Sequence, residues 1–182
     1  RLSIVDKKFA KYKVQNYNND FTLEELCETF RQFAASRLHL YYALPLIRIF
    51  IAGLASTKLV ILQGISGTGK TSLAYAWGKF VKNDSCIASV QPSWRDKTEL
   101  LGYFNEFTKR FNETNVLEEL YSAGFDDNIH TIILDEMNIA RVEYYFAEML
   151  SIMEMPSKDE WVVNLVATPW ENDPKKIVGE IG

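Results

Sequence analysis

The 182-residue sequence has few of the residue types that build metal centres and covalent cross-links. It contains two histidines and two cysteines, and Cys27 and Cys86 do not form a C-x-x-C pair. A structural zinc site and a disulfide framework are therefore not expected. The shortage of cysteine fits a reducing compartment, and we expect a cytoplasmic protein.

Long apolar runs and a surplus of basic charge are also missing. The longest apolar stretch, residues 41–56, is interrupted by Pro45, Arg48 and Gly53, so nothing approaches the roughly 18 residues that a membrane span needs. The formal net charge is −4, which makes a broad electrostatic grip on nucleic acid an unfavoured interpretation. We expect no membrane partner.

The composition that is present is that of a globular protein, with 47% hydrophobic and 24% charged residues. This length predicts one domain, or one domain with an appendage. The sequence begins at Arg1 without a signal peptide, so we expect a piece of a larger protein with both ends artificial. We interpret residues 1–20 as an N-terminal arm or linker and residues 21–182 as one partial domain.

The spacing of apolar residues predicts helices that alternate with short strands. Thr22 and Glu25 form a capping box that predicts the start of a helix. Further helices are expected from about Leu44, over 71–81, over 116–123 and from Arg141. Short apolar runs predict strands at 58–63, 86–91, 129–134 and 161–167. This alternation predicts an α/β fold with a parallel sheet.

Residues 64–71 match the phosphate-loop pattern G-x-x-x-x-G-K-[ST] at every fixed position. The glycines would let backbone N–H groups approach phosphate oxygens, and the following helix would point its positive end at the anion. Lys70 would contact the β- and γ-phosphates, and the Thr71 hydroxyl would ligate Mg²⁺. The alternative is a glycine-rich turn that binds nothing. The expected nucleotide-binding residues are Gly64, Ile65, Ser66, Gly67, Thr68, Gly69, Lys70, Thr71 and Ser72.

In the segment 132–136, a predicted apolar strand is followed directly by two acidic residues, Asp135 and Glu136. Parallel strands align their C-terminal ends at one edge, where ligands bind in open α/β sheets. We expect Asp135 to hold Mg²⁺ and Glu136 to polarise the attacking water, so that they act with Lys70 in catalysis. Because a kinase needs no water activator, the pair favours hydrolysis over transfer to a metabolite.

These motifs resemble those of the AAA-type P-loop ATPases, and more closely the branch with the McrB restriction motor, the MoxR proteins and the dynein-related modules. The resemblance spans about residues 40–170 and rests on GISGTGKT at 64–71, TELLG at 98–102 and LDEMNIARVEYYFAEMLSIME at 134–154. Asn138 follows the acidic pair, as in that branch. Ile139 stands where the branch often has an arginine, and Arg141 comes two positions later.

The resemblance implies a three-layer P-loop NTPase core with a parallel sheet, preceded by N-terminal helices. It implies Mg²⁺-dependent binding and hydrolysis of ATP, or of GTP, in a homo-oligomeric ring that drives a nuclease subunit acting on DNA. The family's sensor strand, arginine finger and helical lid are not evident. We therefore expect a truncated AAA-type domain without a lid, weakly active alone, in which Thr168 is not part of a sensor.

Two other functions stay open, a small P-loop kinase and a nucleotide-binding assembly module without hydrolysis. Residues 92–113 interleave aromatic and basic side chains, a pattern that can serve single-stranded nucleic acid. Packing of this segment on the sheet, or on a neighbouring subunit, is the interpretation that the acidic composition favours. His130 is expected to be structural, and His39 has no assigned role.

Overall fold

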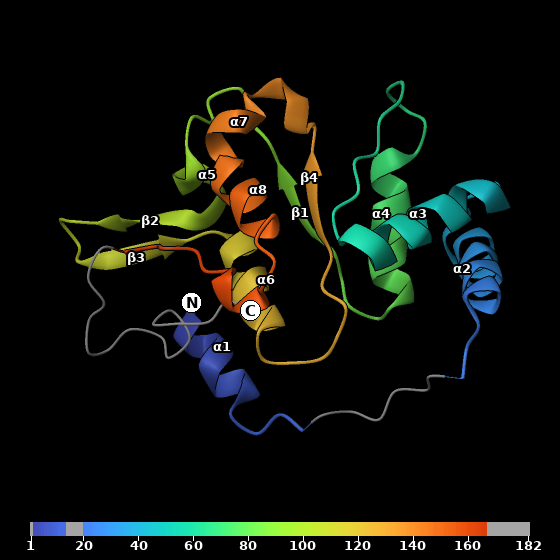
Figure 1. Cartoon of the computed structure of the whole chain (residues 1–182), viewed down its shortest axis with the longest axis horizontal. Coiled ribbons are helices and arrows are strands. Elements are labelled where there is room, and N and C mark those ends of the chain that lie inside the picture. The colour runs from blue at the N-terminus through green and yellow to red at the C-terminus, as the bar shows by residue number, and fades with distance from the viewer. Residues whose placement is uncertain (1, 14–19, 167–182) are drawn as a thin grey trace. The chain divides into compact units, whose positions relative to one another are not determined.

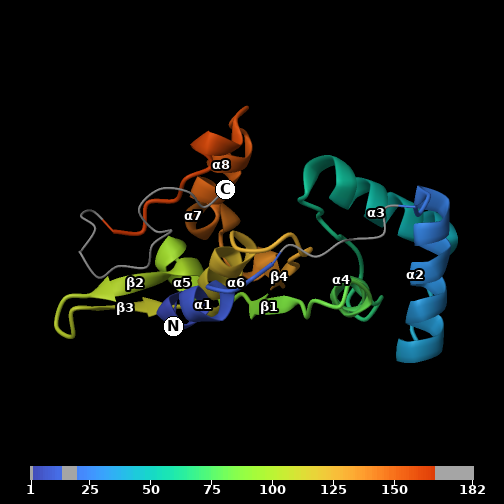
Figure 2. The same cartoon turned by 90° about the horizontal axis from the view of Figure 1, so that it is seen from below.

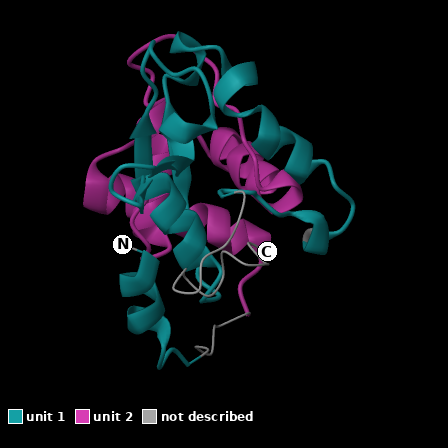
Figure 3. Ribbon diagram, turned by 90° about the vertical axis from the view of Figure 1, so that its left-hand side faces the viewer, with its two compact units in different colours: residues 1–14, 86–182 teal, residues 15–85 magenta. Residues whose placement is uncertain are grey.

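The computed structural model describes residues 2–13 and 20–166, which belong to two compact units (Figures 1, 2 and 3). One unit comprises residues 15–85, and the other comprises residues 1–14 and 86–182. The boundary between residues 85 and 86 falls inside the range 21–182 that the sequence analysis treats as one domain.

Helices α2 (Leu23–Leu38), α3 (Leu44–Thr57) and α4 (Lys70–Phe80) form the unit of residues 15–85. The capping box expected before α2 is present, since the Thr22 hydroxyl accepts the Glu25 N–H and the Glu25 carboxylate accepts the Thr22 N–H at 2.9 Å. Pro45 lies in the first turn of α3, where its missing N–H costs no helical hydrogen bond. The three helices bury Cys27, Phe30, Ile47, Phe50, Ile51, Leu73, Ala76 and Trp77.

The strand expected at 58–63 is not formed, which corrects the sequence analysis. Side chains still alternate there: Val60 and Leu62 pack on the helical core, while Ile61 is 72% exposed. A strand also needs a hydrogen-bonded neighbour, and within the described residues no strand pairs with this segment. The three-layer P-loop core that the resemblance implies is therefore not confirmed, and the chain is an α/β mixture with a small parallel sheet.

The parallel sheet lies in the other unit and consists of β1 (Cys86–Ser89) and β4 (Ile132–Asp135), which lie side by side in Figure 1. Both strands and their parallel direction were predicted, although each is shorter than the predicted run. Their ends align in register, with Ser89 opposite Asp135. The core around them contains Val90, Leu100, Leu101, Val116, Tyr145, Phe146 and Val163.

The segment 92–113, which the sequence left unassigned, forms a short helix and a hairpin. Helix α5 (Lys97–Leu101) leads directly into β2 (Gly102–Asn105), which pairs antiparallel with β3 (Arg110–Glu113). Gly102 has φ +102°, and a Cβ there would collide with the carbonyl oxygen of Asn112, so the pairing requires glycine. Figures 1 and 2 both show this hairpin extending away from β1 and β4.

Helix α6 (Asn115–Ala123) packs against α1 (Leu2–Phe9), the first part of the expected arm. Leu2 and Val5 are buried against α6, and the Tyr121 hydroxyl donates to the Asp6 carboxylate at 2.7 Å. Helix α1 therefore joins the core of this unit through Leu2 and Val5, while Ile4 is 67% exposed. No described helix combines the length and the apolar character needed to cross a membrane.

The helix expected from Arg141 is divided into α7 (Val142–Tyr145) and α8 (Ala147–Met153). The break is at Phe146, which has φ −118° and ψ −3° and whose ring is buried. The predicted strand at 161–167 is also not formed, because residues 161–166 pair with no described strand although Val163 is buried. Ala167 and Thr168 lie outside the described residues.

Candidate functional site

The phosphate loop is an exposed turn that leads into α4. Gly67 and Gly69 have φ values of +80° and +81°, in the left-handed region that residues with a Cβ rarely adopt. A Cβ at Gly67 would meet no atom within 4 Å, so glycine is required there by the backbone conformation and not by crowding. Ile65, at the tip of the turn, is 81% exposed. The loop is thus exposed and has left-handed glycines at 67 and 69.

Helix α4 begins at Lys70, and the preceding residue, Gly69, has no side chain to cap it. At 11 residues the helix has enough aligned peptide groups to favour an anion at its first turn. Thr71 and Ser72 lie in this first turn and are half-buried, whereas Ser66 is exposed. Of the nine residues expected to bind nucleotide, 64–69 form the turn before α4 and 70–72 form the first turn of the helix.

The Lys70 side chain folds back over its own loop. Its Nζ donates to the carbonyl oxygen of Ile65 at 2.7 Å, and the Thr68 hydroxyl donates to the same oxygen at 2.8 Å. A carbonyl is a weaker partner for an ammonium group than a phosphate. Lys70 therefore has a local contact that a bound triphosphate could replace without unfolding the loop.

Tyr42, which the sequence analysis did not assign, supports the end of the loop. Its hydroxyl donates to the Gly69 carbonyl oxygen at 3.3 Å, and its ring lies 3.5 Å from the position of a Cβ on Gly69. Burial raises the pKa of Tyr42, so it remains a neutral donor. The only sequence signal was its place just before α3, which does not reveal a contact across 27 residues.

The acidic pair lies where β4 ends. Asp135 is the last residue of the strand, and its carbonyl oxygen accepts the Val90 N–H at 3.1 Å. Glu136 has φ +54°, a conformation that is uncommon for a residue with a side chain, and leads into the 3-10 turn Met137–Ile139. Glu136 is exposed and Asp135 is half-buried. The strand end was predicted, and the left-handed backbone of Glu136 was not.

The expected Mg²⁺ ligands belong to different units, Thr71 to residues 15–85 and Asp135 to residues 86–182. A hydroxyl and a carboxylate are hard oxygen donors of the kind that Mg²⁺ takes alongside phosphate and water. Within the described residues, no cluster of three or more His, Cys, Asp or Glu side chains could hold a metal ion by itself. Both side chains therefore have the donor chemistry that Mg²⁺ accepts, and their joint use as magnesium ligands stays a prediction.

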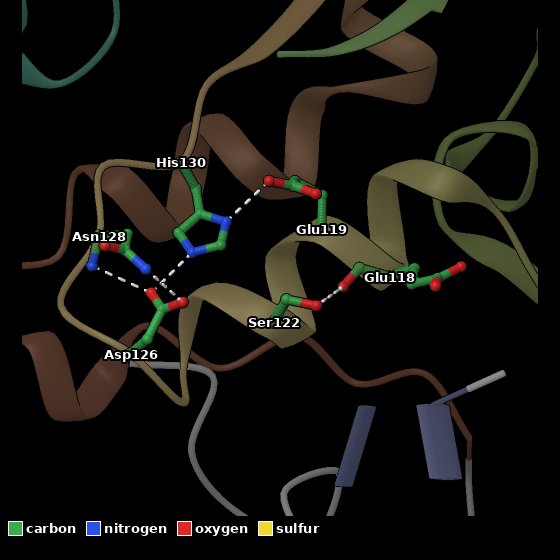
Figure 4. Close-up of polar contacts among 6 residues, drawn as sticks. All are labelled: Glu118, Glu119, Ser122, Asp126, Asn128 and His130. Atoms are coloured by element: carbon green, nitrogen blue, oxygen red, sulfur yellow. Dashed lines mark hydrogen bonds and ion pairs between the residues drawn. The ribbon is translucent and has the colours of Figure 1, made fainter. Parts of the chain in front are cut away.

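His130 is enclosed by two carboxylates (Figure 4). Its Nδ1 lies 2.7 Å from Glu119 of α6, and its Nε2 lies 2.8 Å from Asp126, which Asn128 also contacts. The hydrogen bond with Glu119 is the main cause that raises the pKa of His130. Although burial opposes it, hydrogen bonding from His130 and Asn128 lowers the pKa of Asp126. A carboxylate at each ring nitrogen favours the protonated ring, and these contacts link α6 to the segment that precedes β4, which is a structural role.

Comparison of the chain with family models, with curated proteins and with solved structures gave no match.

Proposed function

We propose that this chain binds a nucleoside triphosphate, ATP or GTP, through residues 64–72 and hydrolyses it with Mg²⁺. The observation that carries the proposal is the loop itself. It matches the phosphate-loop pattern completely, has left-handed glycines at 67 and 69, and opens onto the start of α4 with Lys70 in the first turn.

Asp135 and Glu136 supply the proposed metal and water chemistry. Asp135 would hold Mg²⁺ directly or through water, and Glu136 would orient or deprotonate the attacking water. A strand end that carries two carboxylates supports these roles, as does the resemblance of residues 134–154 to the McrB-like branch. The same resemblance supports the wider proposal of a ring-forming motor that drives a nuclease subunit on DNA.

Isothermal titration of the chain with ATP and with GTP, each with Mg²⁺, tests the binding step. Replacing Lys70 with Ala removes a charge-assisted contact worth about 1.5–3 kcal/mol, so triphosphate affinity should fall roughly ten- to a hundredfold while the fold persists. Lys79→Ala is the matched control, because Lys79 lies in the same helix but pairs with Asp84. It should bind like the unmodified chain.

Unchanged affinity in a folded Lys70→Ala protein would contradict the phosphate-loop assignment. Binding that is intact but followed by no phosphate release, even from the full-length protein, would instead favour the assembly module. Transfer of the γ-phosphate to an added metabolite would favour the kinase.

A further inference from the structure

Two arginine side chains line one open pocket in the unit of residues 1–14 and 86–182. The pocket has a volume of about 520 Å³ and lies between the segment after β1 and the segment after β4. Arg95 comes from the first segment and Arg141 from the second, and both are exposed. Neither forms an ion pair with any residue that the structure describes.

Arg37, Lys82 and Arg110 also have no carboxylate partner among the described residues, so what distinguishes Arg95 and Arg141 is that both line the same pocket. The chain has 24 acidic and 20 basic residues, so carboxylates are in surplus. Basic residues with a carboxylate partner include Arg31, Arg48, Lys79, Lys97 and Lys109. The carboxylate next to Arg95 in sequence, that of Asp96, is already engaged, because it caps α5 by accepting the Thr98 N–H at 2.7 Å.

Two of the lining side chains, Trp94 and Arg141, have contacts that orient them. The Trp94 ring lies 5.2 Å from the ring of Tyr145, at 82°, and Tyr145 is 1% exposed with its hydroxyl donating to the Met137 carbonyl oxygen at 2.8 Å. Arg141 donates to the Tyr144 hydroxyl at 3.1 Å, and its guanidinium carbon lies 5.6 Å from the centre of that ring. Because Arg141 is already oriented, a ligand would have less side-chain entropy to remove on binding.

The lining determines the class of ligand. Each guanidinium has five N–H donors in a planar fork that matches a carboxylate or a phosphate. The volume exceeds what a single anionic group fills, and Pro92 and the half-exposed Ile139 offer apolar contacts beside the arginines. The ligand should therefore carry an apolar group next to its anion.

A polypeptide fits these features better than a nucleic acid does. One face of the Tyr144 ring carries Arg141, which reduces the surface on which a base could stack. The net charge of −4 also disfavours a long phosphate backbone more than a ligand with one or two carboxylates, because the repulsion grows with the number of charges on the ligand. We propose that this pocket binds a segment of a partner polypeptide in which an acidic residue adjoins an apolar one. The proposal does not depend on nucleotide binding.

Nuclear magnetic resonance of the ¹⁵N-labelled chain tests the proposal with a defined probe, a capped pentapeptide of alternating leucine and aspartate. The peptide should shift the arginine Nε–H signals of Arg95 and Arg141 and the indole signal of Trp94, each assigned by substitution. Arg95→Gln and Arg141→Gln should each weaken binding by about tenfold, as expected for loss of a charge-assisted contact. Lys109→Gln, which removes the same charge from the hairpin, should leave the affinity unchanged.

Two competing probes decide the ligand class. The matched peptide with asparagine in place of aspartate should bind at least about tenfold more weakly, because it lacks the carboxylates. Equal binding of that peptide, or full affinity in both arginine variants, would overturn the proposal. It would also be overturned if a short oligothymidylate bound this pocket more tightly than the acidic peptide, or if millimolar peptide produced no shifts.

Discussion

At the scale of single residues, the backbone of Glu136 shows how β4 ends. A glutamate at φ +54° adopts a conformation that costs free energy relative to the common regions, and the surrounding structure holds it there. The conformation turns the chain from the strand into the 3-10 turn Met137–Ile139 and leaves the carboxylate exposed. An exposed carboxylate at a strand end is accessible to a water molecule and to a substrate.

Glu136→Gln should abolish most hydrolysis but preserve nucleotide binding. The amide keeps the shape of the side chain and loses its basicity, so turnover by the full-length protein should fall about 10²-fold or more. Phosphate release and calorimetric binding should be measured on the same preparation. Glu143→Gln, a similar change at another exposed residue after the strand, serves as the control. Unaltered turnover in Glu136→Gln would mean that another group activates the water.

Tyr42→Phe should weaken triphosphate binding without unfolding the chain. The substitution retains the ring beside Gly69 and removes only the hydrogen bond to the Gly69 carbonyl, a contact worth about 0.5–1.5 kcal/mol. We expect the dissociation constant measured by calorimetry to rise by roughly two- to tenfold. Tyr41→Phe is the control, because Tyr41 is 80% exposed. Identical affinities in both variants would show that the loop does not need this support.

At the scale of elements, the connection between α6 and β4 depends on a charged network. His130 joins Glu119 of α6 to Asp126, and Asn128 donates to Asp126 at 2.8 Å. Glu118 is adjacent to Glu119 in sequence but points away from the ring in Figure 4. Because the imidazole is the charged partner of both carboxylates, the strength of this connection follows its protonation.

Stability should therefore depend on pH through His130. Its pKa is raised in the folded state, so its contribution is complete below its unfolded pKa of about 6.5 and is lost as pH rises through the folded value. The pKa of Asp126 is lowered, so its contribution is complete above about 3.9 and is lost as pH falls through the folded value. In urea unfolding experiments, the contribution of these groups to the free energy of unfolding should be greatest between about pH 3.9 and pH 6.5.

Glu119→Gln should remove much of that pH dependence and lower the free energy of unfolding by about 1–3 kcal/mol at pH 6, because a hydrogen bond to a charged group is lost. Glu118→Gln is the matched control at the neighbouring position of α6, and it should leave the pH profile nearly unchanged. Equal pH profiles for the two variants would contradict a stabilising role for the contact between His130 and Glu119.

At the scale of the whole molecule, the resemblance implies that hydrolysis needs a neighbouring subunit. An arginine finger alone can supply about 10³–10⁵ in rate, and no such residue is recognised in this sequence. We predict that residues 1–182 bind nucleotide as a monomer and, by themselves, turn it over only slowly. Light scattering with and without nucleotide, beside a phosphate-release assay, measures both properties. A stable hexamer of this chain, or brisk hydrolysis by it, would disprove the prediction.

The sequence by itself determined the features that depend on local spacing. The capping box at Thr22 starts α2, the glycines and Lys70 form an exposed turn before α4, and the apolar run that ends at Asp135 lies in β4. Each of these features can be predicted from the sequence because it depends only on residues that are near one another in the chain.

The tertiary structure alone decided the features that require a distant partner. The run at 58–63 alternates like a strand, yet strand formation depends on a hydrogen-bonded neighbour that the run cannot specify. Burial of the Phe146 ring accompanies a break in a helix that periodicity predicts to be continuous. Packing likewise decides three other features, because each joins residues that sequence spacing does not relate. These are the contact of Tyr42 with Gly69, the contact of Glu119 with His130, and the position of Arg95 and Arg141 at the same pocket.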